Sequence, residues 1–285
     1  MNIKYFINII LYISISWSIG TQALNIPRNA GSLGISGAGI AGNIDPSINP
    51  AILSNNNNYL QISIDQWLGD VKGSDAAMQW NNNFINHLSL RTWGTNELEL
   101  WGDKPDDEPL GTFGSNWVST TYTLSYAGSK KIQYGMQIGL HYSQLFTENI
   151  SGITTNYGLM FQPSESFNLG AVIRNLGFEN KNGLNSNLPL IFGIGSAYKV
   201  STLNSIILGD FEYDSLQGVT LKSGFLLDTR WLNFKMGYSF NKNKTSASFG
   251  FAFKYQKWQV DCSIMAHENS VLGIPKFIDI RRYIE

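Results

Sequence analysis

The chain of 285 residues contains one cysteine, Cys262, and three histidines. A single cysteine excludes both a disulfide framework and a cysteine-rich metal site. Only 14% of the residues are charged, well below the quarter that is usual in soluble domains. Lys and Arg number 20 and Asp and Glu 21, so the chain lacks the basic excess of a nucleic-acid-binding protein. We therefore expect no nucleic-acid partner.

Long apolar runs are also missing. After residue 23 no stretch of about 18 apolar residues occurs, which argues against a transmembrane helix. Residues 1–23 combine one charge, Lys4, with an apolar run from Tyr5 to Trp17 and small residues before Ala23. This pattern predicts a cleaved signal peptide, with a retained membrane anchor as the alternative. We expect a second segment, 24–58, and then one large domain over residues 59–285.

What the chain does have is alternation of apolar and polar residues from Tyr59 onward. In 232–240, for example, Leu232, Phe234 and Met236 alternate with Asn233 and Lys235. Successive side chains of a strand point to opposite faces, so such segments are half-buried β-strands. The predicted strands, fourteen in number, are 59–67, 84–92, 95–101, 116–127, 132–145, 152–163, 167–175, 189–199, 205–214, 218–228, 232–240, 244–255, 258–267 and 276–284.

The lengths of the predicted connections alternate as well. The longer ones include 68–83, 102–115 and 176–188, and each is followed by a strand and then a short turn. Outer-membrane barrels have short periplasmic turns at one end and longer extracellular loops at the other. The fold class predicted is therefore all-β: a transmembrane antiparallel up-and-down β-barrel of about 14 strands, closed because no backbone group can stay unpaired in hydrocarbon.

A soluble sandwich or a secreted solenoid is the alternative for alternating strands. Its polar faces would meet water and carry many Lys and Glu residues, whereas the polar faces here consist mostly of Gly, Ser, Asn, Gln and Thr. Aromatic residues near strand ends suit the girdles of a membrane barrel. The residues expected in these girdles are Tyr126, Tyr142, Phe161, Tyr198, Tyr213, Tyr255 and Trp258.

Residues 26–57 do not alternate, and they carry a recognisable order of motifs. A stretch of small residues includes Gly37, Gly39 and Gly42, and Asn49-Pro50-Ala51 follows an acidic position. This opening resembles that of the PorV/PorQ family, relatives of the FadL-type channels. Two further stretches fit the same family: Trp67 with Asp70 after the first strand, and Asn175 with Gly177 followed by Pro189 in mid-chain. The chain departs from the pattern at its end, where Glu285 replaces a terminal aromatic residue.

The resemblance implies a barrel in the outer membrane of a Gram-negative bacterium, accessory to type IX protein secretion at the cell surface. It also implies that residues 24–58 fold into the lumen as a plug, with a disordered periplasmic tail as the alternative. The glycines permit tight turns, and Pro46 and Pro50 prevent regular pairing.

Two functions remain open at this point. In the first, a non-enzymatic barrel contacts secretion components or secreted cargo through the long loops, with Trp80, Trp101 and Trp117 as exposed anchors. Anchoring of these tryptophans in outer-membrane lipid is an equal alternative. In the second, the barrel is a FadL-like channel for hydrophobic small molecules. Inward-facing apolar residues would then line a pocket, or they would pack a plug: Val172, Ile191, Ile206, Leu208, Leu226 and Met265.

Other motifs favour no catalytic, cofactor or metal site. Residues 37–42 match the G-x-G-x-x-G pattern but lack the strand and helix that a dinucleotide site requires. His141 is predicted to face the lumen, and no spacing pairs it with a nucleophile. Asp103, Asp106, Asp107 and Glu108 are expected to form a solvated loop rather than a Ca²⁺ site. The charges expected on the inner faces predict an ion-paired lumen rather than an ion-selective pore: Arg174, Lys199, Asp210, Glu212, Asp214, Lys222, Lys235 and Lys254.

Overall fold

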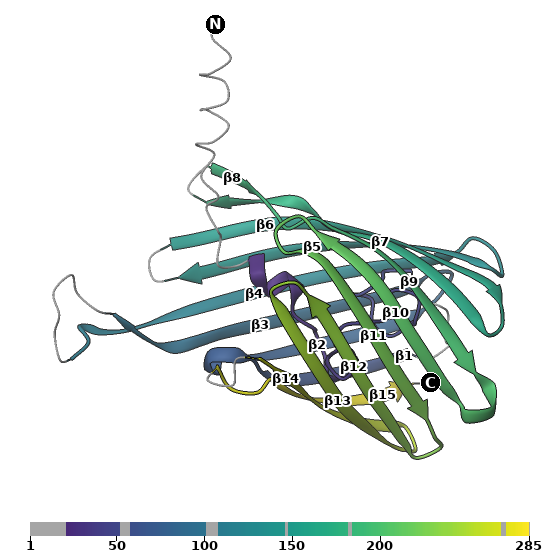
Figure 1. Cartoon of the computed structure of the whole chain (residues 1–285). Helices are drawn as coiled ribbons and strands as arrows, with labels where there is room; N and C mark the ends of the chain where they lie inside the picture. The colour runs from purple at the N-terminus through teal and green to yellow at the C-terminus, as the bar shows by residue number, and fades with distance from the viewer. Residues whose placement is uncertain are drawn as a thin grey trace, which may run out of the picture.

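The structure, a computed structural model, describes residues 21–51, 58–100, 108–145, 148–181, 184–268 and 272–284. Antiparallel strands form a closed barrel that makes up nearly all of it (Figure 1). The strands are β1 (Asn58–Gln66), β2 (Lys72–Asn81), β3 (Ile85–Leu100), β4 (Gly111–Ala127), β5 (Ile132–Leu145), β6 (Glu148–Ser164), β7 (Phe167–Lys181), β8 (Leu184–Asn187), β9 (Ile191–Val200), β10 (Ser205–Asp214), β11 (Gly218–Asp228), β12 (Leu232–Asn241), β13 (Lys244–Tyr255), β14 (Trp258–His267) and β15 (Lys276–Ile284). The helices are short: η1 (Thr21–Asn25), α2 (Ala30–Leu33), η2 (Leu68–Asp70) and η3 (Ser201–Leu203).

Closure of the ring follows from two pairings. The first strand, β1, pairs with the last, β15, and β6 pairs with β7, so the neighbours run round without an open edge. The short β8 pairs only with the outer part of β7, and the other fourteen strands form the ring. Every strand of the ring therefore has a hydrogen-bonded neighbour on both sides, as an apolar surrounding requires. The predicted transmembrane barrel of about 14 strands is confirmed.

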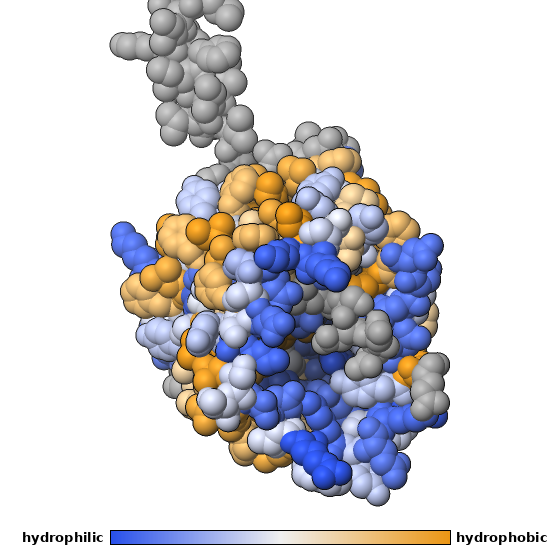
Figure 2. Space-filling view, turned by 90° about the vertical axis from the view of Figure 1, so that its right-hand side faces the viewer, coloured by the Kyte–Doolittle hydropathy of each residue, from blue (hydrophilic) through white to orange (hydrophobic). Residues whose placement is uncertain are grey.

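The two faces of each strand differ in polarity, as the alternation predicts. On β13, Phe249, Phe251 and Phe253 point outward and are about half exposed, while Ser248 and Ala252 point inward and are buried. All seven aromatic residues predicted for the girdles are exposed. Seen from the end where the turns are short, hydrophilic residues gather over the centre and hydrophobic ones over the outer wall (Figure 2). No helix among the described residues is long and apolar enough to span a membrane.

Two strand predictions are wrong. One error misses a strand and the other splits one strand into two, so the predicted total of fourteen still equals the number of strands in the ring. Residues 72–81, predicted as part of a loop, form β2, and the predicted strands 84–92 and 95–101 are one strand, β3. Small residues on both faces of β2, such as Gly73, Ser74 and Ala76, remove the contrast that alternation requires. The predicted loop 68–83 is thus mostly barrel wall.

The connections confirm the predicted asymmetry. At one end, which we call the long-loop end, lie the longest connections: 67–71, 101–110, 182–190 and 268–275. At the other, the short-turn end, every connection is a tight turn: 82–84, 128–131, 165–166, 201–204, 229–231 and 256–257. At the long-loop end β3 and β4 extend past their neighbours as a two-stranded ribbon, visible on the left of Figure 1.

Candidate functional site: the lumenal segment and its pockets

Residues 24–51 run inside the barrel, and we call them the lumenal segment (purple in Figure 1). The segment contains the single turn of α2, whose N-cap Asn29 accepts a hydrogen bond from the Ser32 N–H at 2.8 Å. Irregular turns follow. Seven apolar residues of the segment are fully buried: Ala30, Leu33, Ile35, Ala38, Ile40, Ala41 and Ala51. For these seven side chains to be buried in the lumen, wall residues that point inward must pack against them.

Apolar residues of the segment pack against the wall in three clusters, the first of them on β9, β10 and β11. Ile35, Ala38 and Ala41 form one cluster with Ala197 and Leu208, and Ile206 and Leu226 pack against it. A second cluster joins Ile40 and Ile48 of the segment to Val172, and a third joins Ala30 and Leu33 to Met265 and Phe277. The predicted inward orientation of these wall residues is confirmed. Most of them pack the lumenal segment instead of leaving an empty apolar channel.

Glycine pairs on neighbouring strands receive the backbone of the segment. Each pair consists of register partners, and a Cβ at either position would overlap or crowd the segment at Pro50, Ile40 or Ile35. The pairs are Gly135 with Gly158, Gly170 with Gly195, and Gly224 with Gly237. The missing side chains let the segment approach the wall at backbone distance. We call these pairs the glycine seats.

Two wall carboxylates bind backbone N–H groups of the segment. The Ala30 N–H donates to both oxygens of Asp279, at 3.0 and 2.9 Å. The N–H groups of Gly39 and Ile40 donate to Oδ2 of Asp210, at 2.6 and 3.1 Å. These two contacts hold the start and the middle of the segment against two separate strands of the wall, β15 and β10.

Arg28 holds the segment on the side of β2, β3 and β4. Its guanidinium donates to the hydroxyls of Ser89 at 2.6 Å, Ser119 at 2.9 Å and Thr121 at 3.1 Å. Asp75 lies 3.8 Å away as its ion-pair partner. Burial lowers the pKa of Arg28 from its usual value, and the negative charge of Asp75 opposes this change. Arg28 thus adds a polar attachment of the segment to β3 and β4.

The Asn49-Pro50-Ala51 motif ends the lumenal segment. The Asn49 amide donates to the Ile40 carbonyl at 2.6 Å and to the Leu159 carbonyl of β6 at 3.3 Å. Its oxygen accepts from the Ala51 N–H at 2.9 Å, which closes a tight turn. Of the three glycines singled out from the sequence, Gly37 and Gly39 have positive φ angles of 69° and 127°, and Gly42 approaches Leu208. These residues shape and anchor the segment.

The other two motifs lie at the long-loop end. Trp67 precedes η2, which contains Asp70, and its ring contacts those of Trp93 and Phe277 with centroids 6.1 and 6.0 Å apart. Trp67 therefore lies over the lumen at the long-loop end.

Asn175 and Pro189, distant in sequence, meet in the wall. Asn175 sits at a bulge of β7 with φ of 61°, and its amide donates to the Pro189 carbonyl at 3.1 Å. A Cβ at Gly177 would overlap the Ile153 carbonyl, so the close approach of β6 and β7 requires glycine there. Asn175 and Gly177 therefore shape the wall where β6 and β7 pair.

The predicted tryptophan anchors need correction. Trp117 is only 6% exposed and lies in the lumen against Trp93, with Leu24 packed beside them, because its register position on β4 faces inward. Trp80 belongs to β2 near the short-turn end, where it packs beside Tyr122, so it does not lie in an extracellular loop. Trp101 lies outside the described residues, as do Asp103, Asp106 and Asp107.

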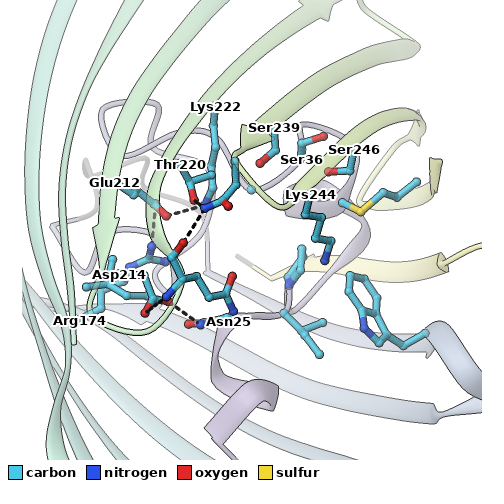
Figure 3. A pocket seen from close by; sticks show the side chains of 18 of the residues that line it. Asn25, Ser36, Arg174, Glu212, Asp214, Thr220, Lys222, Ser239, Lys244 and Ser246 are labelled. Atoms are coloured by element: carbon cyan, nitrogen blue, oxygen red, sulfur yellow. Dashed lines mark hydrogen bonds and ion pairs between the residues drawn. The ribbon is translucent and has the colours of Figure 1, made fainter. Parts of the chain in front are cut away.

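A pocket of about 320 Å³ opens at the long-loop end, above the lumenal segment (Figure 3). One part of its lining is apolar and includes Ile26, Trp67, Leu68, Ile191 and Met265. The opposite part is charged: Glu212 accepts from Arg174 and from Lys222, both at 2.7 Å. Asn25 donates to Asp214 at 2.9 Å beside them. The pocket is thus amphipathic, and its floor includes Ser36 and Gly37 of the segment.

A second cavity, of about 850 Å³, opens at the short-turn end and is polar. Gly42, Asn43 and Ile44 of the lumenal segment form part of its lining, together with Lys199 and Asp228. Since residues 36–37 line the first pocket and residues 42–44 the second, the lumenal segment lies between the two.

Several charges inside the barrel form ion pairs, whereas Asp210 and Asp279 accept hydrogen bonds from backbone N–H groups instead. Arg91 and Asp65 form a 2.7 Å salt bridge in which both side chains are only 1% exposed, and Lys235 pairs with Asp261. His141 faces the lumen as predicted, bonded to Thr154 at 2.7 Å and stacked on Trp117. Within the part of the chain that the structure describes, no group of three His, Cys, Asp or Glu residues could hold a metal ion.

Comparison with known proteins gives a clear result for structure alone. No family model matches the sequence, and no curated protein matches it significantly. Among the similar solved structures are three whose alignments cover 90% of this chain and nearly all of their own chain. They are the CymD monoaromatic hydrocarbon channel (TM-score 0.66, 13% identity, 97% of its chain), a FadL homologue of Pseudomonas aeruginosa (0.63, 11%, 98%) and the toluene transporter TodX of Pseudomonas putida (0.61, 12%, 96%).

The chain therefore has the fold of FadL-like barrels. Identities this low establish the fold and nothing finer. The comparisons support the FadL-like part of the resemblance seen in the sequence, and they do not show the PorV/PorQ family.

Proposed function

We propose that this protein is an outer-membrane channel that admits hydrophobic small molecules at its long-loop end. The observation that carries the proposal is the amphipathic pocket there, whose apolar lining faces an ion-paired polar wall. Its volume of about 320 Å³ is in the range of small-molecule sites. The FadL-like fold adds support, because the CymD and TodX structures are hydrocarbon channels by description.

In this proposal the lumenal segment acts as a plug that must move for transport. It lies between the two cavities and is held by separate polar contacts at Arg28, Ala30 and Gly39. A predicted signal peptide over residues 1–23 would deliver the chain to the outer membrane; residues 1–20 lie outside the described ones. The exposed apolar belt of the wall supports that location.

Uptake of labelled toluene and of a labelled fatty acid into cells that produce the full chain tests the proposal. We expect uptake above that of cells without the protein. A variant that lacks residues 30–51 should raise uptake further, while its heat-modifiable migration in detergent gels shows that the barrel is folded. If the folded full chain and the folded deletion variant both leave uptake at the level of cells without the protein, the channel proposal is wrong.

A role as an accessory of type IX secretion is the second candidate. The ribbon of β3 and β4 extends past the wall at the long-loop end, as does the outer part of β7 with β8, and both could contact a secretion partner or cargo. Deletion of the gene should then leave secreted cargo in the periplasm. Normal export of that cargo in the deletion strain would exclude this role without affecting the channel proposal.

A further inference from the structure

The inner faces of β7, β9 and β10 connect the pocket at the long-loop end with the cavity at the short-turn end. Arg174, Ile191 and Asp214 are register neighbours on these strands, and all three line the pocket. Asn168 and Ala197, which are also register partners, line the cavity. Ile191 and Ala197 lie about 20 Å apart along β9, since a strand advances about 3.3 Å per residue. The wall between these two rows therefore joins the two cavities.

This stretch of wall has little side-chain volume, and Ile40 of the lumenal segment covers it. Gly170 is the register partner of Gly195, and Val172 is that of Gly193. A Cβ at Gly193 would lie 2.6 Å from Cδ1 of Ile40, and a Cβ at Gly195 would lie 2.8 Å from Cβ of Ile40. Ile40 itself is fully buried. One side chain of the segment thus fills the space over the glycines between the two cavities, which we call the Ile40 site.

Asp210 supplies one polar atom to the Ile40 site. The residue is only 5% exposed, and its Oδ2 accepts the N–H groups of Gly39 and Ile40. Its Oδ1 has no hydrogen-bond partner among the residues that the structure describes. A Cβ at Gly195 would overlap this Oδ1, so the oxygen faces the space over that glycine. A buried acceptor without a partner is unfavourable, and a ligand that donates a hydrogen bond there would remove that cost.

We propose that the Ile40 site is a second ligand site, which takes small phenols: a flat apolar ring that carries one hydroxyl group. The ring takes the place of the Ile40 side chain and lies flat on the wall, because Gly193 and Gly195 have no side chains that would obstruct it. Val172 and Ile48, which pack against Ile40, supply apolar contacts. The ligand hydroxyl donates to Oδ1 of Asp210, which a plain hydrocarbon cannot do. The inference rests on the proposed function only for the path by which the ligand reaches the site.

Fluorine NMR with para-fluorophenol and fluorobenzene tests the proposal, because the two probes differ only in the hydroxyl group. Each probe is titrated into the full chain in lipid nanodiscs, and empty nanodiscs give the background from the lipid. In the native chain Ile40 competes with the ligand, so removal of its side chain should strengthen binding. We expect Ile40→Gly to bind para-fluorophenol about tenfold more tightly than the native chain does. Ile40→Gly should also prefer para-fluorophenol to fluorobenzene by about fivefold or more.

Ile48→Gly is the matched control, because Ile48 belongs to the same apolar cluster and lines neither cavity; it should bind like the native chain. Ile40→Gly/Gly193→Val returns a side chain to the vacated space from the wall and should cancel the gain. Heat-modifiable gel migration shows whether each variant is folded, and Ile40→Ala with Ile48→Ala replaces a pair that is not.

Equal affinity of Ile40→Gly and Ile48→Gly for para-fluorophenol would overturn the proposal, as would a gain that Gly193→Val does not cancel. Equal affinity of Ile40→Gly for the two probes would overturn the assignment of a phenol. The uptake experiment tests the channel separately: binding at the Ile40 site without uptake would overturn the channel proposal alone, and uptake without this binding would overturn the Ile40 site alone.

Discussion

Gly135 and Gly158 face each other on β5 and β6, and the backbone at Pro50 occupies the space that two side chains would fill. The carbonyl group of Pro50 lies against Gly135, and the Ala51 nitrogen lies 2.8 Å from the position of a Cβ at Gly158. The end of the lumenal segment therefore contacts the backbone of β5 and β6 directly. The wall can receive it only because both residues lack side chains.

Gly135→Val should displace the segment near Pro50, because the new side chain meets backbone atoms that cannot rotate away. We expect amide hydrogen exchange in residues 40–51 to accelerate by about tenfold or more, as measured by mass spectrometry. Gly209→Val is the matched control, because a Cβ at Gly209 meets only the Ser196 hydroxyl, at 3.8 Å. Unchanged exchange in a folded Gly135→Val protein would show that the seat does not hold the segment.

The outer wall can be tested with one charge at two depths. Ile62 at the middle of β1 is 61% exposed, and Leu203 in η3 at the short-turn end is 62% exposed. In lipid vesicles Ile62→Arg should lower the free energy of unfolding by about 2–4 kcal/mol and Leu203→Arg by about 0–1 kcal/mol. Urea titration followed by tryptophan fluorescence measures both. If the two variants lose equal stability, the surface at Ile62 does not face hydrocarbon.

The buried salt bridge between Arg91 and Asp65 should contribute far more than the exposed one between Lys254 and Asp228. Arg91→Met leaves the Asp65 carboxylate buried beside the Trp93 N–H alone, so we expect a loss of about 3–5 kcal/mol of unfolding free energy. Lys254→Gln should cost about 1 kcal/mol or less. The same urea titration compares them, and similar losses for both pairs would contradict the paired-lumen interpretation.

Filling the pocket at the long-loop end should block the proposed route. Ser239 lines this pocket, so Ser239→Trp should reduce uptake of a hydrophobic tracer by about tenfold. Its control is Ser223→Trp on the neighbouring strand β11, where the side chain is exposed on the outer wall and should leave uptake unchanged. Equal uptake by native chain and Ser239→Trp would place the route elsewhere.

Errors in the strand prediction have a specific cause. Alternation identifies a strand only when one face is apolar and the other polar, and β2 alternates small residues with small residues around Gly73 and Ala76. The inward position of Trp117 was missed for a related reason, since an aromatic residue suits either an interface or a packed lumen. No local pattern separates these two cases.

The sequence by itself determined a closed antiparallel barrel, the polarity of its two faces and the difference between its ends, because the period of two and the spacing of turns are local properties. It also marked the motifs Asn49-Pro50-Ala51, Asn175 and Pro189 without their roles. Only the tertiary structure decided that glycines distant in the chain become register partners, that Asp210 and Asp279 bind the lumenal segment, and that Arg28 reaches three hydroxyls. These contacts depend on how far each strand is shifted against its neighbours, and that shift is set by closure of the whole ring rather than by any one segment.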